Sequence, residues 1–218
     1  MKLNLGCGTT LLEGFVNVDN SPTVLLARMP IVISTLLRKV SLINSYQLEF
    51  LKTIRSGKHR LAYANVLKLP FADGSVDFCY SSHMLGWCLS YEQVRRFGAE
   101  VYRVLRPGGG ARFSFFNFDL LLDDYRQHRS TLRLMERMPL GAAEFTRRGK
   151  LKFLLSTNMN NGIPLNAETF RPILEEAGFV EIRVVGPGET TLAAAEVEGV
   201  DLAQRGNESI YMECRKKI

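Results

Sequence analysis

Short hydrophobic runs alternate with longer amphipathic segments along most of this 218-residue chain. Helical spacing of apolar residues predicts helices over 91–105 and 166–177, the second one capped by Asn166 and ended by Gly178. The short runs predict seven strands, at 2–5, 15–18, 61–65, 76–80, 111–117, 180–185 and 209–215. Strands that alternate with helices in this way are typical of an α/β fold with a mostly parallel sheet.

The first two predicted strands are joined by an unusually short connection. Only ten residues separate Gly8 from Asp19, which leaves no room for a regular crossover helix. We therefore expect residues 9–14 to cross as a compact turn. After the second strand, residues 23–54 carry apolar residues at helical spacing, and we expect two short helices, broken near Pro30 or around 41–44.

Positive charge is concentrated in this helical insertion. The chain has a net charge of +6. Residues 21–60 contain seven basic residues and one acidic residue, and 7 − 1 = +6, so they carry the whole excess. Such a surface attracts phosphates, nucleic acid or anionic lipid, although a solvated face explains it equally well. The most apolar part, residues 24–43, is interrupted by charged residues and a proline, which argues against a membrane-spanning helix.

The four cysteines are scattered along the chain without a CxxC pair or a Cys/His cluster. Their spacing predicts neither a metal site nor a disulfide framework, so we expect reduced thiols. The chain begins directly with strand-like residues and shows no signal peptide. Together these features favour a cytoplasmic protein.

A glycine motif follows the first predicted strand and is the first candidate for chemistry. In Leu5-Gly6-Cys7-Gly8-Thr9 the glycines let the backbone approach a nucleotide-like ligand, and Asp19 at the end of the next strand can accept hydrogen bonds from a ribose. A nicotinamide dinucleotide would require a third glycine where Leu11 stands, and a helix after it. The motif therefore favours a nucleoside site over a dinucleotide site, with a plain tight turn as the alternative.

Two further motifs follow in order. Asn65-Val66-Leu67-Lys68-Leu69-Pro70-Phe71 leads into Asp73-Gly74-Ser75-Val76-Asp77, and Glu100 to Gly109 reads EVYRVLRPGG. Together with the glycine motif, they resemble the class I S-adenosylmethionine-dependent methyltransferases. The stretch from Leu3 to Asp19 is similar to a bacterial group that begins L-N-L-G-S/C-G.

This resemblance implies an α/β, Rossmann-like sheet of seven mostly parallel strands, with helices on both faces and an abbreviated first crossover. It also implies one domain over residues 1–218. The insertion after the second strand, about 21–60, would form a lid, and a variable acceptor-side region would span about 119–165.

The resemblance implies S-adenosylmethionine as the cofactor, with no metal. Its adenine would lie beside Asn65 and Val66. His83, at the end of the fourth strand, is the candidate general base. The cofactor would be held by Leu5, Gly6, Cys7, Gly8, Thr9, Asp19, Asn20, Asn65, Val66, Ser81 and Ser82. Gly86 and Trp87 stand where the group has a Glu-His pair, so a protein that binds the cofactor without catalysis remains an alternative.

The methyl acceptor implied by the group is a small molecule, such as a saccharide precursor, a secondary metabolite or a lipid-linked compound. The basic insertion would also suit peripheral contact with a membrane, or an RNA methyltransferase, although no recognised RNA-binding module is present. The oligomeric state is not indicated. Candidates for the lining of the acceptor pocket are Trp87, Asp119, Asp123, Asp124, Tyr125 and His128.

Overall fold

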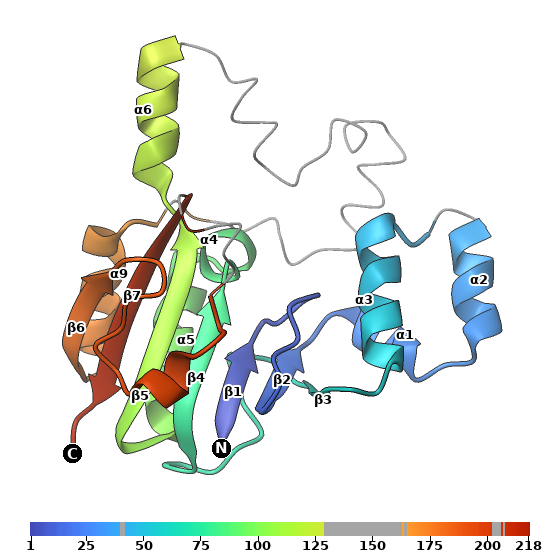
Figure 1. Cartoon of the computed structure of the whole chain (residues 1–218), viewed down its shortest axis with the longest axis horizontal. Coiled ribbons are helices and arrows are strands. Elements are labelled where there is room, and N and C mark those ends of the chain that lie inside the picture. The colour runs from blue at the N-terminus through green and yellow to red at the C-terminus, as the bar shows by residue number, and fades with distance from the viewer. Residues whose placement is uncertain (40–41, 129–162, 164, 202–205, 207) are drawn as a thin grey trace.

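The computed structural model describes residues 1–39, 42–128, 163, 165–201, 206 and 208–218. Its centre is a seven-stranded sheet in the order β3-β2-β1-β4-β5-β7-β6 (Figure 1). Every pair is parallel except the two that involve β7. The strands are β1 (Lys2–Leu5), β2 (Phe15–Asp19), β3 (Arg60–Tyr63), β4 (Val76–Ser82), β5 (Leu105–Phe116), β6 (Phe179–Val185) and β7 (Ser209–Lys216). The predicted fold class is confirmed.

The strand order has a switch point between β1 and β4. The strands β2 and β3 lie on one side of β1, and β4 and all later strands lie on the other side. Ligands of open α/β sheets bind at such a switch point, beyond the carboxyl ends of the strands. Residues 9–14 cross from β1 to β2 without a helix, as predicted. Since β7 is antiparallel, its first residue, Ser209, lies at the same edge as the last residues of β4 and β5.

One face of the sheet is covered by α5 (Tyr91–Val104) and α9 (Ala167–Glu176). The buried side chains of α5 recur every three or four residues, which puts Val94, Phe97 and Val101 on one face against the sheet. Asn166 accepts a hydrogen bond from the backbone of Thr169 and caps α9, as predicted. This face holds the main hydrophobic core.

The opposite face carries little helix over β4 and β5. Over β4 and β5 lies the chain from residue 186 to 201, which contains only the short helix α10 (Ala194–Val197). Leu192 and Val200 of this segment pack on Phe78 and Tyr80. The first crossover is too short for a helix, so this segment near the C-terminus fills part of the space.

The insertion forms three helices, so the prediction of two was wrong. They are α1 (Pro22–Ala27), α2 (Ile31–Lys39) and α3 (Ser45–Arg55). The chain breaks at both places that were considered as alternatives, at Pro30 and before the Asn44 cap of α3. Figure 1 shows the three helices beyond the β3 edge, with α2 outermost.

Within the described residues, the other two helices lie at the carboxyl edge of the parallel strands. They are α4 (Leu85–Cys88), directly after β4, and α6 (Phe118–His128), which projects above the sheet after β5 (Figure 1). β5 begins at Leu105, before the predicted strand start at residue 111, and its pairing with β4 is irregular between Leu105 and Gly110. Most of the predicted region 119–165 lies outside the described residues. No helix among the described residues is long and apolar enough to cross a membrane.

Candidate cofactor site

The turn after β1 requires glycine at two positions. Gly6 and Gly8 have φ values of +66° and +47°, a region that other residues rarely adopt. A Cβ atom at Gly6 would lie 2.7 Å from Cγ of Met84, and one at Gly8 would overlap the hydroxyl of Tyr46. The turn is therefore in close contact with Met84 on one side and with Tyr46 of the helical insertion on the other.

Asp19, the last residue of β2, is hydrogen-bonded to this turn. One carboxylate oxygen accepts from the backbone N–H of Gly8 (3.0 Å), and the other accepts from the N–H of Ser21 (2.7 Å). A carboxylate oxygen can accept two hydrogen bonds, so each keeps one acceptor position for a ligand. Burial raises the pKa of Asp19, although the two backbone hydrogen bonds act in the opposite direction. The side chain is suited to receive two hydroxyl groups.

Asn65 lies at the same edge, beyond the end of β3. The N–H of Ala64 donates to the carbonyl of Asp19 (3.2 Å), which ties the two strand ends together. The Asn65 side chain is exposed, and its oxygen accepts from the N–H of Leu67 (2.9 Å). The glycine turn, Asp19 and Asn65 therefore meet at the carboxyl ends of three neighbouring strands.

Other predicted cofactor residues differ in what they can offer. The side chains of Leu5, Cys7 and Val66 are buried, so only their backbone groups can reach a ligand. Ser81 is also fully buried. Thr9 is partly exposed, Asn20 is exposed, and Ser82 accepts a hydrogen bond from Ser114 (2.9 Å).

The cysteines offer no reactive thiol among the described side chains. Cys7, Cys79 and Cys214 are free and buried, and burial raises the pKa of each. Within the described residues, no group of His, Cys, Asp or Glu side chains is arranged to hold a metal ion.

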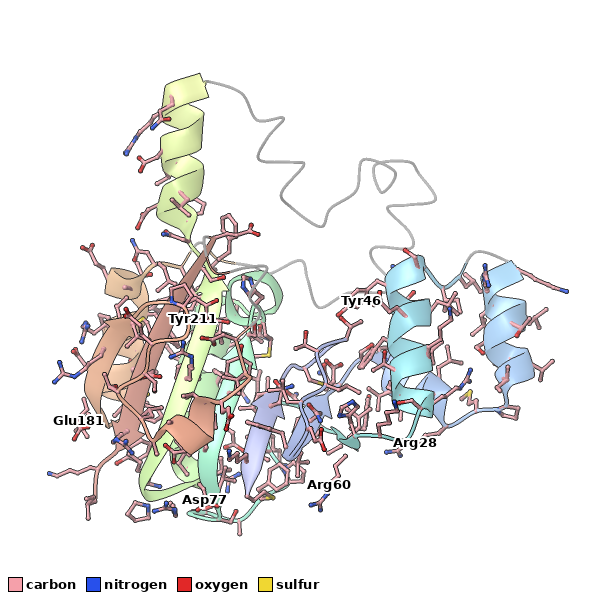
Figure 2. All side chains as sticks on the ribbon, in the orientation of Figure 1. Arg28, Tyr46, Arg60, Asp77, Glu181 and Tyr211 are labelled. Atoms are coloured by element: carbon pink, nitrogen blue, oxygen red, sulfur yellow. The ribbon has the colours of Figure 1, made fainter. Side chains whose placement is uncertain are left out.

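Tyr46 is a site residue that the sequence did not indicate. Tyr46 is the second residue of α3, and in Figure 2 its side chain points from the helix toward the strand ends. Its hydroxyl interacts with Thr9, and partial burial of this group raises its pKa. α3 therefore lies over the glycine turn. The only sequence signal was a tyrosine near the start of an amphipathic helix.

His83 follows β4 and has φ = +53°, a left-handed conformation that histidine tolerates better than most residues. Its backbone N–H donates to the carbonyl of Ser114 (2.7 Å), and Nε2 lies 2.9 Å from Oγ of Ser209 on β7. These contacts fix the backbone of His83 against β5 and its imidazole against β7. Backbone strain of this kind tends to occur at functional sites.

The other candidates for the acceptor pocket are less informative. Asp119 and Asp123 are exposed on α6. The side chains of Trp87, Asp124, Tyr125 and His128 lie outside the described part of the structure.

Known proteins that are similar to parts of this chain include methyltransferases. Residues 41–113 match the family model of a methyltransferase domain. A malonyl-[acyl-carrier protein] O-methyltransferase of Serratia marcescens is 35% identical over 60 residues, which is 28% of this chain and 22% of that protein. The protein of the same name from Methylococcus capsulatus is 41% identical over 71 residues, 32% of this chain and 25% of that protein. These matches span a quarter or less of the relatives' length.

Solved structures resemble the chain over its whole length. A SAM-dependent methyltransferase of Thermotoga maritima superposes with a TM-score of 0.55 and 15% identity, covering 99% of this chain and 82% of that one. Another from Methanosarcina mazei gives 0.53 and 17%, covering 100% and 92%. The chain has the fold of the class I S-adenosylmethionine-dependent methyltransferases.

Proposed function

We propose that this chain binds S-adenosylmethionine at the edge formed by the glycine turn, Asp19 and Asn65, and transfers its methyl group to a small-molecule acceptor. The observation that carries the proposal is the Asp19 carboxylate, which is held by Gly8 and Ser21 and keeps one acceptor position on each oxygen. A ribose has two adjacent hydroxyl groups that match this pair.

The bound cofactor would supply a methyl group activated on a sulfonium. The glycine turn allows close approach of the ligand, and Asn65 lies where a base can be recognised. Reaction then depends on alignment of the acceptor with the methyl group and on exclusion of water. His83 would take the proton of a hydroxyl acceptor as the oxygen bonds to the methyl carbon and the carbon–sulfur bond breaks. Tyr46 and α3 would shield the glycine turn from solvent.

Replacing Asp19 tests the cofactor site directly. We expect Asp19→Ala to weaken binding of S-adenosylmethionine by on the order of 1–3 kcal/mol, because one or two hydrogen bonds to the ribose are lost. Isothermal titration calorimetry would measure the affinity for S-adenosylmethionine. Glu13→Ala removes an exposed carboxylate from the same crossover and serves as the matched control. Unchanged affinity in the folded Asp19→Ala protein would exclude the proposed ribose site.

Cofactor binding should also release protons when the pH is near the raised pKa of Asp19. Burial raises the pKa of Asp19 in the free protein, whereas ribose hydroxyl donors favour the charged carboxylate. Binding therefore lowers this pKa, and affinity falls as the pH drops through the raised value of the free protein. Calorimetry in two buffers of different ionisation enthalpy would detect the released protons. The same buffer dependence in Asp19→Asn would assign them to another group.

A small-molecule acceptor is favoured by the surroundings of His83. The imidazole is partly buried and hydrogen-bonded to Ser209, and the backbone N–H of His83 donates to the carbonyl of Ser114. The curated relatives named above are described as acting on malonyl groups carried by a protein, which is also a small reacting group. Labelled methyl transfer into the small-molecule fraction of a lysate would support this class, whereas label in RNA would overturn it.

A further inference from the structure

The helix α2 presents its apolar side chains to solvent. Val32 is 70% exposed, Ile31 68% and Leu36 61%, although these residue types are usually buried. The buried position of the helix is a serine, Ser34, which is 4% exposed. Three apolar residues of α2 therefore contribute little to packing within the chain, while a polar residue occupies its buried position.

Polar contacts attach α2 to the rest of the insertion. The guanidinium of Arg55, at the end of α3, donates to Oγ of Ser34 (2.9 Å) and to the carbonyl of Met29 (3.1 Å). An attachment of this kind leaves the apolar side chains free for another contact. Figure 1 shows α2 as the element farthest from the sheet along the β3 edge. We call Ile31, Val32 and Leu36 the outer face of α2.

The charged residues of the segment that carries the outer face have one sign. From Pro22 to Lys39 the chain contains Arg28, Arg38 and Lys39 and no acidic residue. Arg38 and Lys39 lie in the last turn of α2, next to the outer face, and both are exposed. Figure 2 shows Arg28 at the end of the insertion opposite Tyr46. The apolar residues are thus flanked by positive charge.

Charge and polarity decide which kind of partner fits the outer face of α2. A second copy would bring two basic segments together, and like charges facing each other oppose association. Nucleic acid would neutralise the charges, but it offers no apolar surface for the exposed Val32 and Leu36. An anionic membrane surface meets both requirements, because the apolar side chains enter the boundary between headgroups and acyl chains while the basic residues contact the headgroups.

We propose that the outer face of α2 docks the protein onto anionic lipid membranes. The docking residues lie at the far side of the insertion from the glycine turn, so membrane contact and cofactor binding are separable. The contact would hold the enzyme at the surface where lipid-linked or membrane-partitioned molecules are concentrated. Docking itself does not depend on the proposed methyl transfer.

Vesicle flotation with the full chain tests this proposal. We expect binding to vesicles of phosphatidylcholine with phosphatidylglycerol, weaker binding to phosphatidylcholine alone, and a further decrease as salt is raised. The double variant Val32→Asp/Leu36→Asp should lose binding. Arg38→Gln/Lys39→Gln should weaken it by roughly fivefold for each charge removed. Calorimetry with S-adenosylmethionine should give the same affinity for these variants as for the unmodified protein.

A matched control is available on the opposite side of the molecule. Val184 on the edge strand β6 is 51% exposed, and Val184→Asp should leave vesicle binding unchanged. Circular dichroism and the thermal midpoint would establish that each variant is folded. Absence of binding to anionic vesicles would overturn the proposal. So would a concentration-dependent dimer in sedimentation velocity that Val32→Asp abolishes, because the outer face would then belong to a second copy.

Discussion

Arg112→Met is expected to destabilise the protein by about 3–5 kcal/mol, because it leaves buried carboxylates without their partner. Arg112 lies on β5 and is 1% exposed, and Glu213, its register partner on β7, is fully buried. Its guanidinium donates to Glu213 (2.5 Å) and forms an ion pair with Asp201. It also donates to the carbonyl of Glu189 (2.9 Å). These contacts hold residues 186–201 against the sheet.

The decrease in unfolding free energy caused by Arg112→Met should become smaller as the pH falls. Burial would raise the pKa of Glu213, but hydrogen bonds from Thr191 and Thr190 and the Arg112 guanidinium hold it below its ordinary value. Glu213 therefore stabilises the unmodified protein above its unfolded pKa, and this contribution is lost on acidification. Without Arg112 the pKa of Glu213 rises, so protonation relieves the buried charge as the pH falls.

Urea unfolding at neutral and at mildly acidic pH measures both effects. The difference in unfolding free energy between Arg112→Met and the unmodified protein should narrow at the lower pH. Arg95→Met is the matched control, since Arg95 pairs with Glu176 on the surface, where ion pairs contribute little. Equal unfolding midpoints for Arg112→Met and Arg95→Met would contradict the role assigned to the cluster.

The parts of the site that are close in sequence could be predicted because local chemistry dictates them. Positive φ at Gly6 and Gly8, a compact crossover and an acid at the end of the next strand all lie within residues 5–19. The parallel arrangement then brings Asn65 to the same edge as Asp19, since the carboxyl ends of parallel strands meet there.

The predictions that were wrong, and the site residues that were missed, depend on contacts between residues far apart in the sequence. Tyr46 reaches Thr9 only through the way in which three helices fold back on the strand ends. Ser209 comes beside His83 only because β7 is antiparallel to β5. The outward apolar face of α2 was equally invisible, because helical periodicity shows that one side is apolar and not which way that side points.

The largest expected effect on activity comes from His83. We expect His83→Asn to reduce methyl transfer by about 10²–10⁴-fold if the acceptor is a hydroxyl, because the variant removes the group that takes the proton. Asparagine also tolerates the left-handed backbone at this position, so the loss would not come from the turn. Affinity for S-adenosylmethionine should stay close to that of the unmodified protein.

Ser209→Ala separates positioning from proton transfer in the same experiment. Its hydroxyl lies 2.9 Å from Nε2 of His83, so its loss should shift the pH profile of methyl transfer and lower the rate less than His83→Asn does. The readout is labelled methyl from S-adenosylmethionine recovered in the small-molecule fraction of a lysate. Full activity in His83→Asn would mean that the acceptor arrives already deprotonated, as an amine does, or that another group is the base. Cofactor binding without transfer in the unmodified protein, across lysate fractions, would instead identify a binding protein built on a methyltransferase fold.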